Sequence, residues 1–388
     1  MKDLKTKVIG LTMMLCFVLV GTASAAEGIK VNVDGSALNM DVAPVMQEGR
    51  VLVPFRFIAE NLGGIVSWDA GSQTVKIVTA DKNVSLPVGQ TTATVNGTAQ
   101  TLDVPATVVD GRTLVPVRFV AESLGADVSW DDATQTVNVK YFSGITGTLK
   151  VGGSTTVLPV AQASADALMK LSPGLSVTVT GGGSGVGTSG AKDGTLNIGM
   201  QSSDLKQEDK AAGLVPVSVG RDAIVVIVNK ANTVEALTRE QIKKIFSGEI
   251  KNWQDVGGKN AAIVLHTREA GSGTLDGFNS LIMKKEAEID AIAEPHASNP
   301  LVKQAVANDE NAIGFLSLGH LDTSVKGIVA EGVVASEANA ATGQYPFVRN
   351  LWLSTKGTPS GQAAKFINFV RSVKGQQILA SEDFIPLR

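Results

Sequence analysis

Four short segments of the sequence carry donor groups that together could hold a small anion. They read GGSTTVLP (152–159), TGGGSGVG (180–187), IGMQSSDL (198–205) and REAGSGT (268–274). Hydroxyl groups and glycine amides dominate these segments, and their one cationic side chain is an arginine. The candidate binding residues are Ser154, Thr155, Thr156, Ser184, Ser202, Arg268, Ser272, Gly273 and Thr274.

The chemistry that suits these residue types is recognition of a tetrahedral oxyanion. Glycine-rich turns and helix N-termini offer unpaired N–H groups to an anion. Hydroxyl groups add donors without charge, and a guanidinium can reach two oxygens of the same anion. Each hydrogen bond to a charged group contributes roughly 1.5–3 kcal/mol. Replacing the water around a buried dianion therefore requires several loops to converge, because one Gly-Ser turn alone could equally be an ordinary surface turn.

Other chemistries that use glycine-rich loops do not fit the spacing. A dinucleotide fingerprint that starts at Gly181 requires a glycine where Val186 stands. A phosphate-binding loop of the NTPase type needs a lysine after its last glycine, but Thr188 follows Gly187. A nucleophile elbow at Ser184 would also need glycine in place of Val186. We therefore expect a binding protein, with no cofactor, rather than an enzyme.

The histidines do not suggest a metal or catalytic site either. His266, His296 and His320 are scattered along the sequence, and nothing marks a Ser-His-acid set. We expect each imidazole to be a core or surface side chain, and we expect no bound metal.

The elements that position the four segments follow an α/β pattern after residue 145. The expected strands are SVTVT (176–180), AIVVIV (223–228), AAIVLH (261–266) and GIVAEGVV (327–334). The stretch 237–246 has a capping box from Thr238 to Gln241 and apolar residues at helical spacing, and 363–373 is a second amphipathic helix. A region of this length, 145–388, suits two lobes around a cleft.

The region before residue 142 contains an internal duplication. Residues 31–77 match 93–139 at 23 of 47 positions without a gap. Each copy has an Asp-Gly or Asn-Gly hairpin signal, a helix that ends at glycine, and then two strands around a short turn. This pattern predicts a small duplicated α+β domain, in which we expect Trp68 and Trp130 to anchor the core.

The N-terminal segment indicates where the protein acts, and the net charge bears on its partners. Lys2, Lys5 and Lys7 precede an apolar run at 8–20 and an Ala-Ser-Ala site at 23–25, the pattern of a secretory signal over 1–25. The only cysteine, Cys16, lies within this run, so we expect an exported chain without disulfides. The net charge of −3 gives no indication of a nucleic-acid partner.

The duplicated region resembles a known family of secreted bacterial domains. LVPxRFxAExLG followed by VSWD occurs in both copies, and over about 28–141 it is similar to the copper amine oxidase N-terminal-like domain. This resemblance implies a stalk or a possible cell-wall contact, although a plain folded spacer fits as well. It does not imply copper, because residues 28–141 contain neither histidine nor cysteine.

The rest of the chain, about 145–388, resembles the phosphate-binding proteins of phosphate ABC importers. The four segments above, LTREQIKKIFSGEIKNWQDVGG, NAIGFLSLGH and YPFVRNLWLSTKG occur in that family's order. The resemblance implies a type II periplasmic-binding-protein fold, with lobe one at 145–222 and 345–388 and lobe two at 223–344. It also implies inorganic phosphate as ligand, a membrane permease as partner, and a location in the periplasm, in the cell wall or on the outer face of the membrane.

One difference from the family pattern leaves the identity of the anion undecided. Family members often have an aspartate after the IG strand that accepts the proton of hydrogen phosphate, but Ser202 falls there and Asp204 reaches the place only with an insertion. Sulfate or another tetrahedral oxyanion therefore stays an alternative ligand. A surface-attachment or sensing role that uses the duplicated domain is a second alternative.

Overall fold

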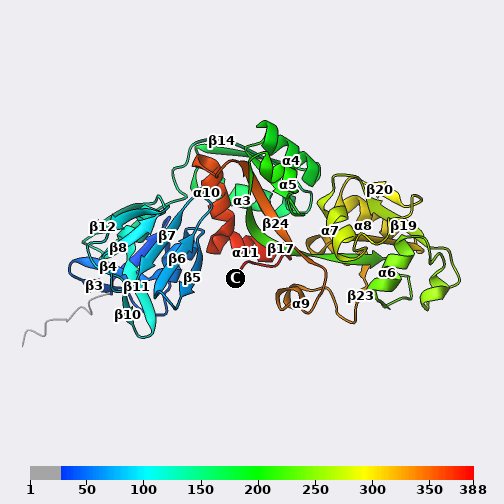
Figure 1. The fold of residues 1–388 in the computed structure, drawn as a ribbon, viewed down its shortest axis with the longest axis horizontal. Helices are drawn as coiled ribbons and strands as arrows, with labels where there is room; N and C mark the ends of the chain where they lie inside the picture. The colour runs from blue at the N-terminus through cyan, green and yellow to red at the C-terminus, as the bar shows by residue number, and fades with distance from the viewer. Residues whose placement is uncertain (1–27) are drawn as a thin grey trace, which may run out of the picture.

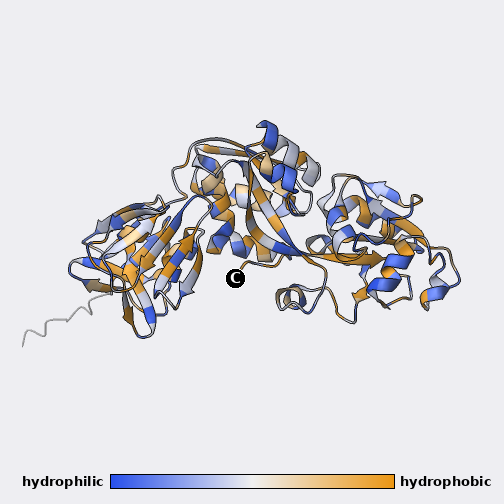
Figure 2. Ribbon diagram, viewed as in Figure 1, coloured by the Kyte–Doolittle hydropathy of each residue, from blue (hydrophilic) through white to orange (hydrophobic). Residues whose placement is uncertain are grey.

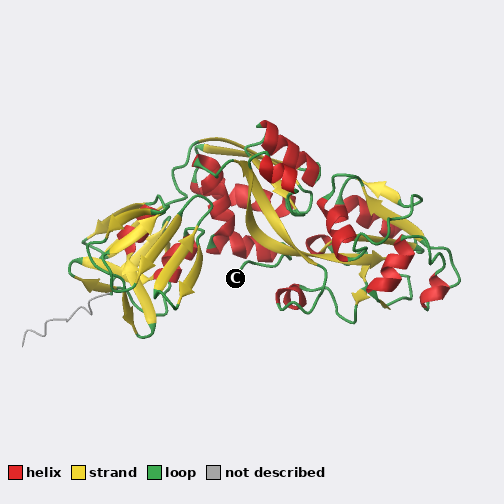
Figure 3. Cartoon of the chain, in the orientation of Figure 1, coloured by secondary structure: helices red, strands yellow, loops and turns green. Residues whose placement is uncertain are grey.

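The computed structural model describes residues 28–388, so the predicted signal segment lies outside the described residues. Figure 1 shows three bodies in a row, with the N-terminal domain (residues 28–141) at one end. Figure 3 shows that this domain is mainly strand, whereas the other two bodies combine helices with strands. No helix among residues 28–388 is both long and apolar enough to cross a membrane.

The two sequence repeats of the N-terminal domain are interleaved rather than side by side. Strand β1 (Lys30–Val33) of the first repeat pairs in parallel with β13 (Thr136–Lys140) of the second. Strand β8 (Thr92–Val95) of the second repeat pairs with β7 (Asn83–Pro87), which lies between the two repeats in the sequence. The first sheet has the order β12 (Asp127–Asp131), β13 (Thr136–Lys140), β1 (Lys30–Val33), β2 (Ser36–Ala37). The second has β10 (Thr107–Val109), β11 (Arg112–Pro116), β4 (Arg50–Pro54), β3 (Val45–Gln47). The third has β5 (Ile65–Asp69), β6 (Thr74–Val78), β7 (Asn83–Pro87), β8 (Thr92–Val95), β9 (Thr98–Thr101).

The local signals of each repeat are confirmed. Asp34 and Gly35 both have positive φ between β1 and β2, as a two-residue hairpin requires. The expected helices are α1 (Phe55–Asn61) and α2 (Val117–Ser123), and Ile58 is fully buried on α1. Gly63 follows α1 with φ +83°, where a Cβ would overlap the carbonyl oxygen of Asn368.

The expected role of the tryptophans is wrong for Trp68. Its side chain is 45% exposed, because this position of β5 faces away from the core and lines a groove together with Phe55 and Phe57. Trp130 is only partly buried against the core. Smaller side chains fill the interior instead, among them Val75 and Ile77.

One nine-stranded sheet runs through the other two bodies. Its order is β15 (Leu175–Thr180), β14 (Gly147–Gly153), β16 (Ile198–Gln201), β24 (Val348–Lys356), β17 (Leu214–Val228), β21 (Ala312–Ser317), β19 (Val264–Arg268) and β20 (Glu294–His296), with β22 (Lys326–Gly327) also on β17. The long strand β17 pairs with β24 over 214–223 and with β21 over 224–228. This strand therefore passes from one body into the next, and Figure 2 shows its hydrophobic second half.

Helices cover the sheet in two groups that define two lobes. The first lobe has α3 (Leu158–Leu171), α4 (Ser184–Asp193), α5 (Gln207–Ala211), α10 (Gly361–Arg371) and α11 (Val373–Ser381). The second lobe has α6 (Arg239–Phe246), α7 (Gly273–Leu281), α8 (Asn299–Asn308) and α9 (Glu337–Ala341), together with the short pair β18 (Ala236–Leu237) and β23 (Val329–Ala330). Val219 of β17 packs in the core of the first lobe and Ala223 in that of the second.

Two sequence expectations differ from the structure in detail. The apolar run 327–334 is not one strand, because Glu331 and Gly332 adopt positive φ and end β23 in a turn. The run 261–266 becomes a strand only from Val264, since Ala262 instead bridges to Asn252. The capping box of α6 is confirmed, with Thr238 and Gln241 bonded reciprocally.

The N-terminal domain is packed firmly on the first lobe. The buried Asn368 side chain of α10 accepts from the amide of Ala80 at 2.8 Å and donates to the Tyr141 hydroxyl at 2.8 Å. Lys365 lies over the Tyr141 ring, 3.3 Å from its centroid. One continuous apolar cluster joins the two bodies, so they form a shared core.

Candidate anion-binding site

The structure gathers all nine candidate residues where the two lobes meet. On the first lobe, Ser154, Thr155 and Thr156 form the turn between β14 and α3, while Ser184 begins α4 and Ser202 follows β16. On the second lobe, Arg268 ends β19 and residues 272–274 begin α7. All of them except Thr155 are buried.

Hydroxyl groups of the first lobe bond to one another and across the lobe boundary. Ser154 Oγ donates to Ser202 Oγ at 3.0 Å, and the amide of Ser202 donates to Ser184 Oγ at 3.1 Å. Across the boundary, Thr156 Oγ1 lies 3.1 Å from Thr274 Oγ1. These groups therefore form one dense cluster of polar donors with almost no solvent exposure.

Local backbone geometry brings the second lobe close to this cluster. Ser272 caps α7 by accepting from the amide of Leu275, and the first turn of α7 lies against the first lobe. At Gly273 a Cβ would overlap Ser184 Oγ and lie 2.6 Å from Ser202 Oγ. Only glycine permits this approach of the two lobes.

The guanidinium of Arg268 is held in place by neutral acceptors. Nε donates to the carbonyl of His296 at 3.1 Å, Nη1 to Asn299 Oδ1 at 3.1 Å, and Nη2 to the carbonyl of Ala297 at 3.0 Å. Nη2 also reaches Thr155 Oγ1 of the first lobe at 3.3 Å. No ion pair joins Arg268 to a carboxylate within residues 28–388.

The charge of Arg268 is therefore buried without an anionic partner in the part of the chain that the structure describes. Burial, and then the nearby charge of Arg349, lower the pKa of Arg268 to about 10, while Glu269 opposes this shift. The guanidinium stays protonated at neutral pH. A buried cation among hydroxyl and amide donors is an arrangement that favours an anion.

Sequence reasoning missed a buried ion pair beside the cluster. Arg349 on β24 bonds to Asp222 on β17 through Nε at 2.9 Å and Nη2 at 2.6 Å. The same Nη2 reaches Thr156 Oγ1 at 3.2 Å and Thr274 Oγ1 at 3.1 Å, so Arg349 touches both lobes. The signal was present, because Arg349 interrupts the apolar residues of β24, and Asp222 with its neighbour Arg221 interrupts those of β17.

The histidines, which we expected to be core or surface side chains, also make contacts that the sequence did not reveal. His266 and His296 lie on the neighbouring strands β19 and β20, with His266 Nδ1 3.0 Å from His296 Nε2. His320 lies 3.1 Å from the carbonyl of Thr155. Burial, and then the charge of His296, lower the pKa of His266. Sequence separation concealed these contacts, because parallel strands bring distant segments into register.

Two α/β lobes that share long crossing strands, with a buried donor cluster between them, define a two-lobed binding protein of the type II periplasmic-binding-protein fold. By the family-model match and the relatives that follow, the chain belongs to the PBP superfamily and, within it, to the family of the phosphate-binding protein PstS. The family model of the PBP superfamily domain matches residues 138–374, and that of the copper amine oxidase N-terminal domain matches residues 32–139.

Individual relatives support this assignment. The phosphate-binding protein PstS of Bacillus subtilis is 33% identical over 247 residues, which cover 62% of this chain and 81% of that protein. A putative phosphate ABC transporter substrate-binding protein with bound phosphate from Clostridium perfringens has a TM-score of 0.60 and 36% identity, over 62% of this chain and 100% of that one. An ABC-type phosphate transport receptor from Vibrio cholerae has a TM-score of 0.53 and 32% identity, over 61% and 99%.

Proposed function

We propose that this protein is the extracytoplasmic substrate-binding component of a phosphate ABC importer and binds inorganic phosphate between its lobes. The observation that carries the proposal is the buried Arg268, which has hydroxyl and amide donors around it and no carboxylate paired with it among residues 28–388. Relatives named for phosphate binding, and a similar structure that contains phosphate, agree with this ligand. The proposed role is binding and delivery, not catalysis.

The nine candidate residues give the proposal a mechanism. Ser154, Thr155, Thr156, Ser184 and Ser202 would donate from the first lobe, and the remaining candidates would donate from the second: Arg268, Ser272, Gly273 and Thr274. An anion that contacts both sides stabilises the closed arrangement over an open one, because only the closed form offers every donor. The closed protein then docks on a membrane permease and releases the anion there. The lobes that move would be 145–222 with 345–388, and 223–344.

Removal of the guanidinium tests the proposal directly. Calorimetric titration of phosphate into Arg268→Ala should show a loss of affinity of at least 100-fold, because a buried charged hydrogen-bond donor is lost. Arg118→Ala is the matched control, since Arg118 pairs with Glu122 on the surface of the N-terminal domain. Wild-type affinity in Arg268→Ala would contradict the assignment of this arginine.

Sulfate is the alternative ligand that the site must be tested against. Ser202 is part of the donor cluster, whereas Asp204 accepts from the indole of Trp352 at 3.0 Å. Asp222, a buried aspartate near the cluster, is occupied by Arg349 and by the hydroxyl of Ser317. Parallel titrations with phosphate and sulfate between pH 6 and pH 8 would decide which anion binds. Equal or tighter binding of sulfate would contradict the phosphate proposal.

We propose surface attachment as a second role, carried by the N-terminal domain of the exported protein. Two grooves related by the duplication support it: one of about 640 Å³ with Trp68 and Arg112, and one of about 360 Å³ with Trp130 and Arg50. Trp68 is exposed and Trp130 is partly exposed, and the neighbouring Arg112 and Arg50 pair with the surface carboxylates Asp41 and Asp103. Aromatic and charged side chains of this kind suit a cell-wall polymer. Joint replacement of Trp68 and Trp130 by alanine should release the protein from the cell-wall fraction while phosphate affinity stays unchanged. Full retention of that variant would contradict the role.

A further inference from the structure

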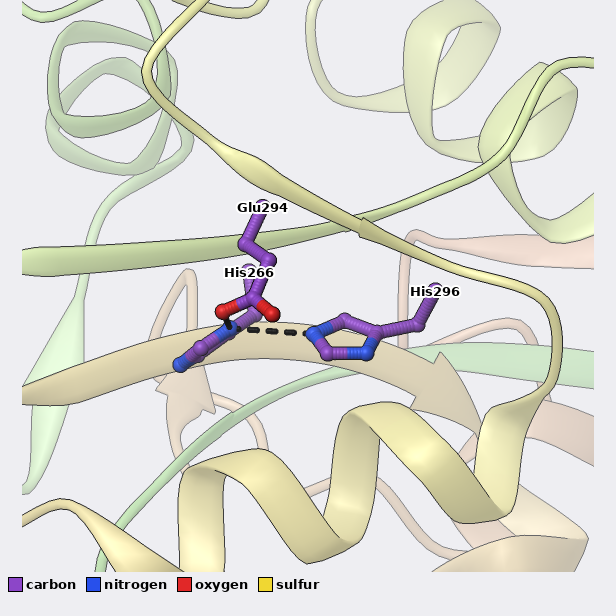
Figure 4. Close-up of side chains that lie close together, drawn as sticks. All are labelled: His266, Glu294 and His296. Atoms are coloured by element: carbon purple, nitrogen blue, oxygen red, sulfur yellow. Dashed lines mark hydrogen bonds and ion pairs between the residues drawn. The ribbon is translucent and has the colours of Figure 1, made fainter.

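Two histidines and a glutamate bring three metal-ligand atoms together in the second lobe, as Figure 4 shows. His266 is on β19, and Glu294 and His296 are on β20. In the parallel register His266 lies opposite Glu294, and His296 lies opposite Arg268. His266 Nδ1 is 3.0 Å from His296 Nε2 and 3.5 Å from Glu294 Oε2, and all three ligand atoms lie within 4.8 Å of one another.

We propose that His266, Glu294 and His296 form a binding site for a divalent transition-metal ion, with zinc as the best fit. Imidazole nitrogens and a carboxylate are a common ligand set for Zn²⁺. Bonds of about 2.0–2.1 Å in a tetrahedral site place ligand atoms about 3.3 Å apart. The separations of 3.0 and 3.5 Å lie on either side of this value, and the remaining separation, between the ligand atoms of His296 and Glu294, is at most 4.8 Å. Rotation of the exposed Glu294 side chain can therefore complete the ligand set.

The surroundings of the three side chains allow a metal to enter and to be bound. The Glu294 side chain is 66% exposed, whereas that of His266 is 6% exposed, so the site has one buried side and one open side. Water can fill the fourth coordination position on the open side. Coordination of an ion through Nδ1 leaves the His266 proton on Nε2, which is buried and has no hydrogen-bond partner among the described residues.

The site is connected to Arg268 through one residue. The carbonyl of His296 accepts from Arg268 Nε at 3.1 Å, and Arg268 stands two residues after His266 on β19. A metal that joins β19 to β20 therefore fixes the acceptor that orients the guanidinium. If the proposed function holds, metal binding changes phosphate affinity, and phosphate changes metal affinity by the same factor.

The primary experiment measures the metal alone. Zn²⁺ is titrated calorimetrically into untagged, chelator-stripped protein, and Co²⁺ is added separately to record the visible absorption of tetrahedral cobalt. We expect one equivalent with micromolar or tighter affinity, reduced at least 100-fold in His296→Ala and about tenfold in Glu294→Gln. The exposed position of Glu294 makes its conservative variant safe for folding. His320→Ala is the matched control and should keep wild-type zinc affinity.

The outcomes separate the metal site from the phosphate proposal. Absence of zinc binding to the wild type, or undiminished binding in both His296→Ala and Glu294→Gln, would overturn the metal site. A phosphate titration with and without Zn²⁺ then tests the coupling, for which we expect a several-fold change that disappears in Glu294→Gln. An unchanged phosphate affinity would refute the coupling. Failure of phosphate to bind at all would refute the proposed function while the zinc titration stays interpretable.

Discussion

Replacement of Gly273 by alanine should hold the two lobes apart. The new Cβ would overlap Ser184 Oγ and lie 2.6 Å from Ser202 Oγ, and both of these groups belong to the opposite lobe. The φ of Gly273 is not positive, so alanine suits the first turn of α7 and should leave the second lobe intact. The clash therefore acts only on closure.

The magnitude follows from the cost of inserting a methyl group into a closely packed contact. Overpacking of this kind costs about 1–3 kcal/mol, which corresponds to a loss of about 5- to 150-fold in phosphate affinity at about 1.4 kcal/mol per tenfold. Isothermal titration calorimetry measures the affinity, and small-angle scattering with saturating phosphate reports whether the lobes close. The melting temperature should change little.

Gly181→Ala provides the matched control in the glycine-rich loop. A Cβ there would meet Thr155 Cγ2 at 3.5 Å and Leu158 Cδ2 at 3.6 Å, which are ordinary contacts. We expect its phosphate affinity to stay within about twofold of the wild type. If Gly273→Ala also bound phosphate with wild-type affinity, then the tight contact of α7 with the first lobe would not be part of the bound state.

Three further predictions concern charge. Arg349→Met leaves the fully buried Asp222 unpaired, so the free energy of unfolding in urea should fall by about 3–5 kcal/mol. If Arg349→Met destabilised the protein less than replacement of an exposed arginine does, the importance of this ion pair would be contradicted. Ser202→Asp adds a carboxylate among the donors, which repels sulfate but can accept the proton of hydrogen phosphate, so sulfate affinity should fall at least tenfold more than phosphate affinity in competition titrations. Burial lowers the pKa of Lys365 to about 8 from 10.5, so the folded protein releases this proton before the unfolded chain does, and wild-type stability should rise relative to Lys365→Met from pH 8 to pH 9.5. A difference in melting temperature that is flat across this range would show that Lys365 is solvated.

Much of the fold could be predicted from the sequence, because local signals agreed with the tertiary structure. The hairpin turn at Asp34-Gly35, the capping box of α6 and the apolar run of β17 each specify one conformation. Helix α4 could not be recognised in this way, since SGVGTSGAKD has weak helix propensity. Packing decides there, because Gly187 lies so close to β14 and β16 that a Cβ would be 2.6 Å from the carbonyl of Met200.

The residue types of the candidate site could be predicted from the sequence, but the side-chain contacts beside it could not. Hydroxyl-rich turns after strands identify the donor segments, since strand ends in an α/β sheet meet at one edge. The partnership of Asp222 with Arg349 depends on the register between β17 and β24, which pairs these two positions. The contact of His266 with His296 depends in the same way on the register of β19 and β20. Neither strand register can be inferred from the local sequence patterns.

If the lobes move as proposed, the shared core makes the N-terminal domain and the first lobe move as one unit. Asn368 and Lys365 attach α10 to that domain, and Figure 1 places the second lobe at the far end of the molecule. If the N-terminal domain is attached to the cell surface, it would hold the first lobe in a fixed position. The second lobe would then be the part that rotates about the crossing strands. The direction in which the second lobe opens would then depend on how the N-terminal domain is oriented on the cell surface, and not on free tumbling of the protein.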